Sequence, residues 1–205
     1  MGDLPENVTY VKVDFAKDNI SGVPKAAGFL EGAKSFYIWE DVCMYLPEES
    51  VRETLRMVGS HTAPGSSIVL DYASSLAIEF GKLTPHGAGG IPSDWREPWI
   101  FGVPGANGSE FFRELGFDPG IPISFHNPEA IKRYAVRRDG ASYASHVMEK
   151  LRAEAQARIQ AGIAPPPLPE GFLEAQNAIR AVGGAYWITE LTMLQPTQRH
   201  IEQSS

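Results

Sequence analysis

Two short apolar segments, 35–39 and 67–71, flank one amphipathic helical segment that begins near Pro47. Segment 35–39 runs without polar alternation, which is typical of a strand in a parallel sheet covered on both faces. In the helical segment Val51, Leu55 and Val58 recur at helical spacing. A strand, a helix and a second strand at this spacing predict a right-handed βαβ unit whose two strands are parallel neighbours.

Further segments extend this unit to an α/β domain, which we expect to be a three-layer sheet with helices on both faces. A β-rich segment at 8–13 predicts an opening strand, and 185–191 alternates as a member of an antiparallel pair does. We expect one domain over 1–195 and a flexible tail over 196–205. Within the domain we expect a lid-like loop at 81–108, a possible strand at 121–125 and a helical part at 140–182 with a Pro-rich connector at 165–169. Further helices are predicted at 109–115, 127–134, 144–161 and 171–182.

The charge balance narrows the range of partners. Eighteen Lys and Arg against 25 Asp and Glu give a net charge of −7, which disfavours binding to a phosphate backbone. The single cysteine, Cys43, cannot form an internal disulfide, and we predict no metal site. No apolar run approaches the roughly 20 residues that span a bilayer, and no secretion signal is visible. We therefore expect a cytoplasmic protein that binds neither nucleic acid nor membrane.

Several common catalytic motifs are missing from the 205 residues. There is no GxxxxGK[ST] phosphate loop, no GxSxG nucleophile elbow and no HExxH metal pair. No predicted strand is followed by GxGxxG, and the glycine group at 87–90 lies within the long loop. A hydrolase of the α/β class is disfavoured by the missing elbow.

Acidic residues stand at the carboxyl ends of three predicted strands: Asp14, Glu40 and Asp71. In open α/β sheets ligands bind outside these strand ends. Asp14 is followed by Phe15, and Glu40 is preceded by Trp39. In both pairs a carboxylate that accepts hydrogen bonds stands next to an aromatic residue. This pattern suits a nucleoside-like ligand, whereas Asp71 is equally consistent with a cap of the following helix.

Three longer segments resemble the leucine carboxyl methyltransferase family: VTYVKVDF (8–15), FYIWEDVCMYLPEE (36–49) and GSSIVLDY (65–72). EPWIFG (97–102) and FFRELGF (111–117) also look like this family, so the resemblance spans roughly residues 5–140. Members are class I S-adenosylmethionine-dependent O-methyltransferases with a Rossmann-like sheet of strand order 3-2-1-4-5-7-6. The resemblance thus implies S-adenosyl-L-methionine as the cofactor and a small-molecule carboxylate or hydroxyl as the methyl acceptor.

The resemblance also implies roles for particular residues. Asp14 would accept a hydrogen bond from the adenine amino group, with Phe15 against the ring. Glu40 would bind the ammonium group of the methionine part through a charge-assisted hydrogen bond. With family geometry, Asp14 and Glu40 should point into the same crevice.

On the acceptor side the residues leave alternatives open. Tyr45 and Tyr72 would face the acceptor, and a core position is the alternative for each. Trp99, together with Trp95 and Phe101, would line the acceptor side or pin the long loop as an apolar cluster. No catalytic residue is assigned, because methyl transfer depends mostly on positioning in a dry pocket.

Two departures from the family pattern affect the expected site. The chain has no Gly-x-Gly-x-Asp-x-Arg loop, and 8–13 resembles the third family strand, so we expect a C-terminal part that lacks the first two βα units. The strand at 8–13 would then lose its neighbours and add beside 35–39, self-associate or fray. The second departure is Asp41, where the family usually carries glycine.

Two functions remain open on the sequence alone. The first is a C-terminal part of an S-adenosylmethionine-dependent methyltransferase with impaired cofactor binding. The second is a non-catalytic remnant of the same fold that acts as a binding or interaction protein. Both share every visible motif.

Overall fold

The structure is a computed structural model of the 205-residue chain. It describes residues 5–15, 18, 22, 25, 27–83, 98–124, 127–134, 136–142, 145–164 and 167–194. Residues 84–97 of the predicted lid-like loop, Trp95 included, lie outside the described residues, as do Pro165 and Pro166 of the connector and the tail from 195 onward.

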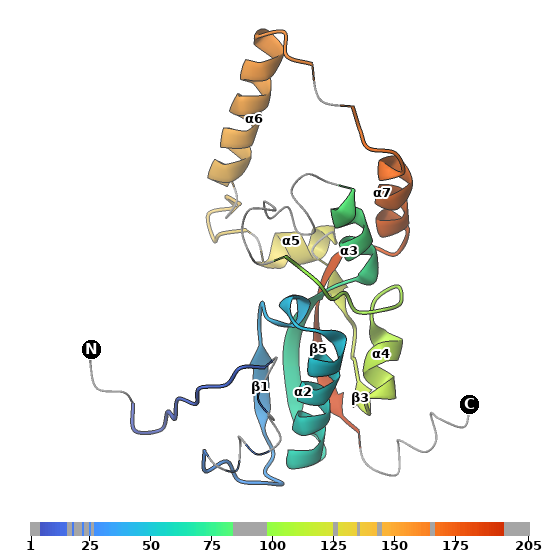
Figure 1. Cartoon of the computed structure of the whole chain (residues 1–205). Coiled ribbons are helices and arrows are strands. Elements are labelled where there is room, and N and C mark those ends of the chain that lie inside the picture. Colours follow the sequence, from blue (N-terminus) through green and yellow to red (C-terminus); the bar gives the residue numbers. More distant parts are fainter. Residues whose placement is uncertain are drawn as a thin grey trace.

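Five strands form one mixed sheet, seen nearly edge-on in Figure 1. They are β1 (Phe36–Trp39), β2 (Ser67–Ala73), β3 (Phe117–Asp118), β4 (Ile123–Ser124) and β5 (Tyr186–Met193). The order is β1-β2-β5-β3, and β4 also pairs with β5. This mixed α/β arrangement is compatible with a Rossmann-like fold.

Three strand predictions are confirmed. β1 and β2 are parallel neighbours, with Phe36 opposite Ser67 and Trp39 opposite Leu70. β5 pairs antiparallel with β2 along its length, with Ala73 opposite Tyr186. These strands were predictable from their apolar runs and alternation, although only one face of β1, with Tyr37 and Trp39, packs toward the core.

The predicted strand at 8–13 is wrong. This segment belongs to no strand, and Val8, Tyr10 and Val11 are 40%, 74% and 47% exposed. β-branched and aromatic residues favour a pleated surface only where a neighbouring strand supplies hydrogen bonds and packing. The described residues supply no such neighbour for 8–13.

The predicted strand at 121–125 is present only in part. β3 and β4 both pair antiparallel with β5, at opposite ends of it, and the proline-containing segment 119–122 separates them. Proline cannot donate to a ladder, so it interrupts a strand here. The Thr189 hydroxyl compensates by donating a hydrogen bond to the carbonyl oxygen of Pro119.

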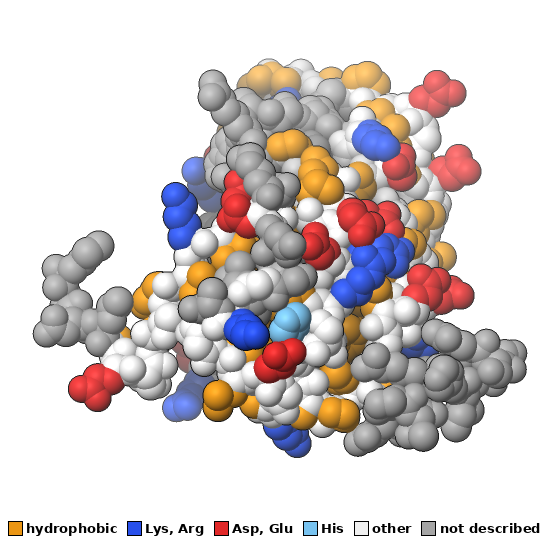
Figure 2. Space-filling view, turned by 60° about the horizontal axis from the view of Figure 1, so that its bottom comes forward, with side chains coloured by type: hydrophobic (Ala, Val, Ile, Leu, Met, Phe, Trp, Pro, Cys, Tyr) orange, Lys and Arg blue, Asp and Glu red, His pale blue; other side chains and the backbone are white. Residues whose placement is uncertain are grey.

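Helix α2 (Glu48–His61) covers one face of the sheet, as Figure 1 shows. Its buried residues Val51, Leu55 and Val58 join the core formed by Trp39, Leu70 and their neighbours. On its outer side Arg52 pairs with Glu48 at 2.7 Å and Arg56 with Glu49 at 2.8 Å. Figure 2 shows acidic and basic side chains lying next to each other on the surface of the molecule.

The other face of β1 has no such cover, which corrects the expectation of helices on both faces. Phe36 and Ile38 point to the side opposite Tyr37 and Trp39, and they are 61% and 72% exposed. Within the described part of the chain no helix packs on these two side chains.

The remaining helices lie at one end of the sheet or beside it (Figure 1). They are the 3₁₀ helix η2 (Cys43–Tyr45), α3 (Ser75–Lys82), α4 (Ser109–Glu114), α5 (Pro128–Tyr134), α6 (Ser145–Gln160) and α7 (Phe172–Ala181). The rings of Phe80 on α3 and Phe172 on α7 pack at 4.9 Å, while α6 projects away from the sheet. The helices predicted at 109–115, 127–134, 144–161 and 171–182 are thereby confirmed.

Candidate functional site

A pocket of about 520 Å³ opens where the parallel strands β1 and β2 end. Glu40 and Asp41, directly after β1, line it together with Asp71 of β2 and Tyr186 of β5. Apolar side chains of the same three strands complete the lining: Ile38, Trp39, Val69, Leu70 and Ile188. The pocket therefore lies at the strand ends where open α/β sheets bind ligands.

Asp41 fixes the backbone immediately after Glu40. Its φ angle of 55° lies in the left-handed region, which is unfavourable for residues other than glycine but is tolerated by Asp and Asn. This left-handed geometry is a physical reason why glycine suits the position of Asp41. The Asp41 N–H donates a 2.7 Å hydrogen bond to Oδ1 of Asp71, which holds the turn in place.

The Asp71 carboxylate is the polar centre of the pocket wall. It is 8% exposed, and its second oxygen accepts a hydrogen bond from the Tyr186 hydroxyl. Burial and the neighbouring Asp71 raise the pKa of Tyr186 well above its usual value, so this phenol stays a donor at neutral pH. Asp71 caps no helix, since Ser74 is the residue that caps α3.

Cys43 lies behind this wall. Its thiol is buried and donates to the backbone carbonyl of Asp71 at 3.0 Å. Burial, reinforced by the charges of Asp71 and Asp41, raises the pKa of Cys43 to about 12. The thiol is therefore protonated and unreactive at neutral pH, and it contributes packing rather than nucleophilic chemistry.

Of the three predicted cofactor residues, Glu40 lines this pocket, whereas Phe15 lines a separate pocket of about 440 Å³ together with Tyr37 and Met57. Glu40 is exposed at the mouth, and the Phe15 ring stacks on Trp39 with 6.4 Å between ring centroids. Asp14 is absent from the residues that line the pocket, so its meeting with Glu40 in one crevice stays a prediction. The Trp39 indole N–H is buried and has no hydrogen-bond partner among the described residues.

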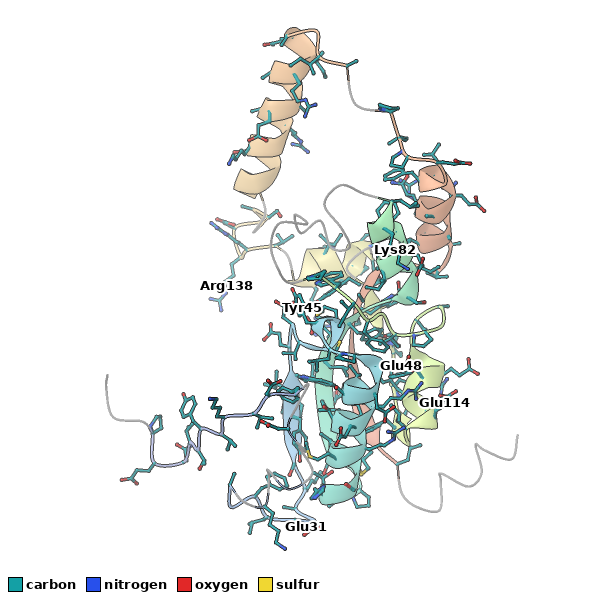
Figure 3. The ribbon with its side chains drawn as sticks, viewed as in Figure 1. Glu31, Tyr45, Glu48, Lys82, Glu114 and Arg138 are labelled. Atoms are coloured by element: carbon teal, nitrogen blue, oxygen red, sulfur yellow. The ribbon has the colours of Figure 1, made fainter. Side chains whose placement is uncertain are left out.

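The predicted acceptor-side residues separate into two groups. Tyr45 and Trp99 pack together around Met44 and Ala73, and Trp99 stacks on Tyr186 at 5.7 Å. Figure 3 shows Tyr45 at the end of the sheet nearest α5. Tyr72, in contrast, is completely buried in the main core, and its hydroxyl donates to the carbonyl of Asn107 at 2.6 Å.

Sequence reasoning missed the partnership of Asp71 and Tyr186. The position of Asp71 at a strand end marked it as a candidate, but Tyr186 lies 115 residues away and carried no signal of its own. The antiparallel register that places Ala73 opposite Tyr186 is what brings the two side chains together.

Two classes of site find no support in the described part of the chain. It contains no group of three or more His, Cys, Asp or Glu side chains that could hold a metal ion. Each helix described there is too short or too polar to cross a membrane.

The family model for leucine carboxyl methyltransferase matches residues 1–59 of the 205. The matched part contains Asp14, Phe15, Glu40 and Tyr45, whereas Asp71, Tyr72, Trp99 and Tyr186 lie outside it. A comparison with curated proteins finds no match. Residues 1–59 thus match the leucine carboxyl methyltransferase family, in agreement with the sequence resemblance over this part of the chain.

Proposed function

We propose that this chain forms part of an S-adenosylmethionine-dependent O-methyltransferase that acts on a carboxylate or hydroxyl group of a small molecule. One observation carries the proposal: the exposed carboxylate of Glu40, within the family match, stands at the mouth of a pocket at the carboxyl ends of two parallel strands. At about 520 Å³ the pocket has the size of a small-molecule site.

The sheet order supports this proposal. The observed order β1-β2-β5-β3 agrees with the 4-5-7-6 part of the family order, if β1 takes the place of the fourth strand. Glu40 then follows the fourth strand, where the resemblance puts the carboxylate that binds the cofactor's ammonium group.

The residues present fit one part of the cofactor. Glu40 would hold the ammonium group, and Phe15, which lines a separate pocket, contacts this one only through its stacking on Trp39. When bound, S-adenosylmethionine would supply a methyl group on a sulfonium, whose sulfur leaves as a neutral thioether and needs no general acid. The adenine part has weaker support, because Asp14 does not line the pocket and the 205 residues contain no Gly-x-Gly-x-Asp-x-Arg loop. We therefore expect weak cofactor binding by this chain alone.

On the acceptor side Tyr45 and Trp99 remain the proposed contacts. They lie in one aromatic cluster with Tyr186, whose hydroxyl is held by Asp71 at the pocket wall. These rings would exclude water and orient the acceptor, which is the main contribution that a protein makes to a displacement at a methyl group.

Equilibrium dialysis with labelled S-adenosylmethionine tests the role of Glu40. Replacing a charged hydrogen-bond partner costs about 1.5–3 kcal/mol, so Glu40→Gln should weaken binding by at least ~10-fold. Glu31→Gln is the matched control, because Glu31 is an exposed acid at the opposite end of the sheet (Figure 3). Equal affinity in Glu40→Gln and the wild-type chain would remove Glu40 from the site.

The missing glycine loop favours a second candidate, a non-catalytic binding protein of the same fold. The two functions differ in turnover. Transfer of labelled methyl groups to a panel of small carboxylic acids and phenols supports the enzyme, whereas cofactor binding without transfer to any of them supports the binding protein.

A further inference from the structure

The outer edge of β1 pairs with no strand among the described residues, and it has exposed apolar side chains. Within this part of the chain β1 is the terminal strand of the sheet and pairs with β2. The Ser67 N–H donates to the Ser35 carbonyl, so the backbone groups of 35, 37 and 39 face β2, and those of Phe36 and Ile38 face outward. Such an edge pairs readily with another strand.

The side chains along this edge have a self-complementary order. Lys34, Phe36, Ile38 and Glu40 alternate along one side of the extended segment, and all four are exposed. A positive charge stands at one end, a negative charge at the other, and two apolar residues lie between. No proline or inward-pointing charge interrupts β1, although natural edge strands commonly carry such features against unwanted pairing.

We propose that two copies of this chain associate through antiparallel pairing of their β1 strands, centred on Tyr37. In this register Phe36 lies opposite Ile38 of the partner subunit, and Lys34 lies opposite Glu40 of the partner subunit. The two-fold symmetry repeats each contact, so the interface contains two apolar pairs and two pairs of opposite charge.

The backbone supports the same register. Because Phe36 and Ile38 both direct their N–H and C=O groups outward, the pair Phe36 and Ile38 of the partner subunit can exchange two hydrogen bonds in the narrow antiparallel pattern. By symmetry, Ile38 and Phe36 of the partner subunit exchange two further hydrogen bonds. A register shifted by one residue would place outward-facing backbone groups opposite inward-facing ones, so the two strands could not exchange these hydrogen bonds.

A charge-reversal experiment tests this pairing by sedimentation of the whole chain over a micromolar concentration range. Lys34→Glu and Glu40→Lys each place like charges opposite each other twice, so each should raise the dimer dissociation constant at least ~10-fold. The double variant Lys34→Glu/Glu40→Lys restores opposite charges and should recover the wild-type constant. The runs contain no S-adenosylmethionine, because Glu40 also lines the pocket.

A second pair of variants tests the apolar part. Ile38→Lys should abolish the dimer, whereas Ile121→Lys should leave it unchanged, because Ile121 is also an exposed isoleucine but lies away from β1. Thermal melts at low concentration show whether each monomer remains folded. Hydrogen exchange should show that the amides of Phe36 and Ile38 become protected only as the concentration rises.

Three results would overturn the proposal. One is a monomer at all concentrations, and another is a dimer that tolerates Ile38→Lys. The third is protection of the Phe36 and Ile38 amides that does not depend on concentration, which would indicate that a segment of the same chain covers the edge.

Discussion

Removing the Tyr186 hydroxyl should destabilise the fold, because this hydroxyl donates to a buried carboxylate. Asp71 is 8% exposed and has two polar contacts at its carboxylate, the Asp41 N–H and Tyr186. A hydrogen bond to a charged group contributes about 1.5–3 kcal/mol, and its loss leaves one oxygen of Asp71 poorly satisfied. Tyr186→Phe keeps the ring that stacks on Trp99, so the change isolates the hydroxyl.

Urea unfolding followed by far-UV circular dichroism measures this effect. With a slope of about 2 kcal/mol/M, the midpoint should fall by roughly 1 M. Tyr45→Phe is the matched control, because Tyr45 is half-buried and its hydroxyl has no hydrogen-bond partner among the described residues. A loss below about 0.5 kcal/mol in Tyr186→Phe, or an equal loss in both variants, would show that the Tyr186 hydroxyl does not stabilise the buried Asp71 carboxylate.

Three further predictions follow from backbone geometry and from Cys43. Gly108→Ala should lower the free energy of unfolding by about 2–4 kcal/mol, because its φ is +73° and the new Cβ would lie 2.8 Å from Val103. Gly105→Ala, at φ +84° with open space around it, should lower it by about 1 kcal/mol. Equal losses of the two variants in chemical denaturation would contradict this difference. The pKa of Cys43 is raised from 9.0 to about 12, so at pH 8 its thiol in the folded chain should react with a thiol reagent about a thousandfold more slowly than in the unfolded chain. Equal rates in the folded and unfolded chains would show that the thiol is accessible. Because the folded state holds this proton more tightly, stability should fall as the pH rises above about 9, and Cys43→Ala should flatten that part of the pH–stability curve.

The sequence allowed the parallel strands to be predicted because each has a local signal, although β1 is buried on one face only. The apolar runs at 35–39 and 67–71 and the helix between them each carry their own signal, and a βαβ crossover has one common geometry. The strand at 8–13 has an equally strong local signal, yet it is absent, because a strand also requires a neighbour. That requirement depends on contacts that no local pattern contains.

The candidate site shows the same division between local and distant information. Glu40 was predictable as an acid at a strand end within a family-like segment. The Asp71 contacts were not, because Asp41 and Tyr186 reach it from 30 and 115 residues away. Asp41 stood out as a departure from glycine, and its φ of 55° supplies the physical reason that glycine suits the position.

The pocket beside Glu40 is proposed to bind S-adenosylmethionine. A titration of the isotope-labelled chain, followed by amide NMR shifts, tests it directly and tolerates weak affinity. The largest shifts should occur at Glu40, Asp41 and Asp71, and Glu40→Gln should greatly reduce them. Shifts confined to residues remote from this pocket, or no shifts at millimolar cofactor, would contradict it.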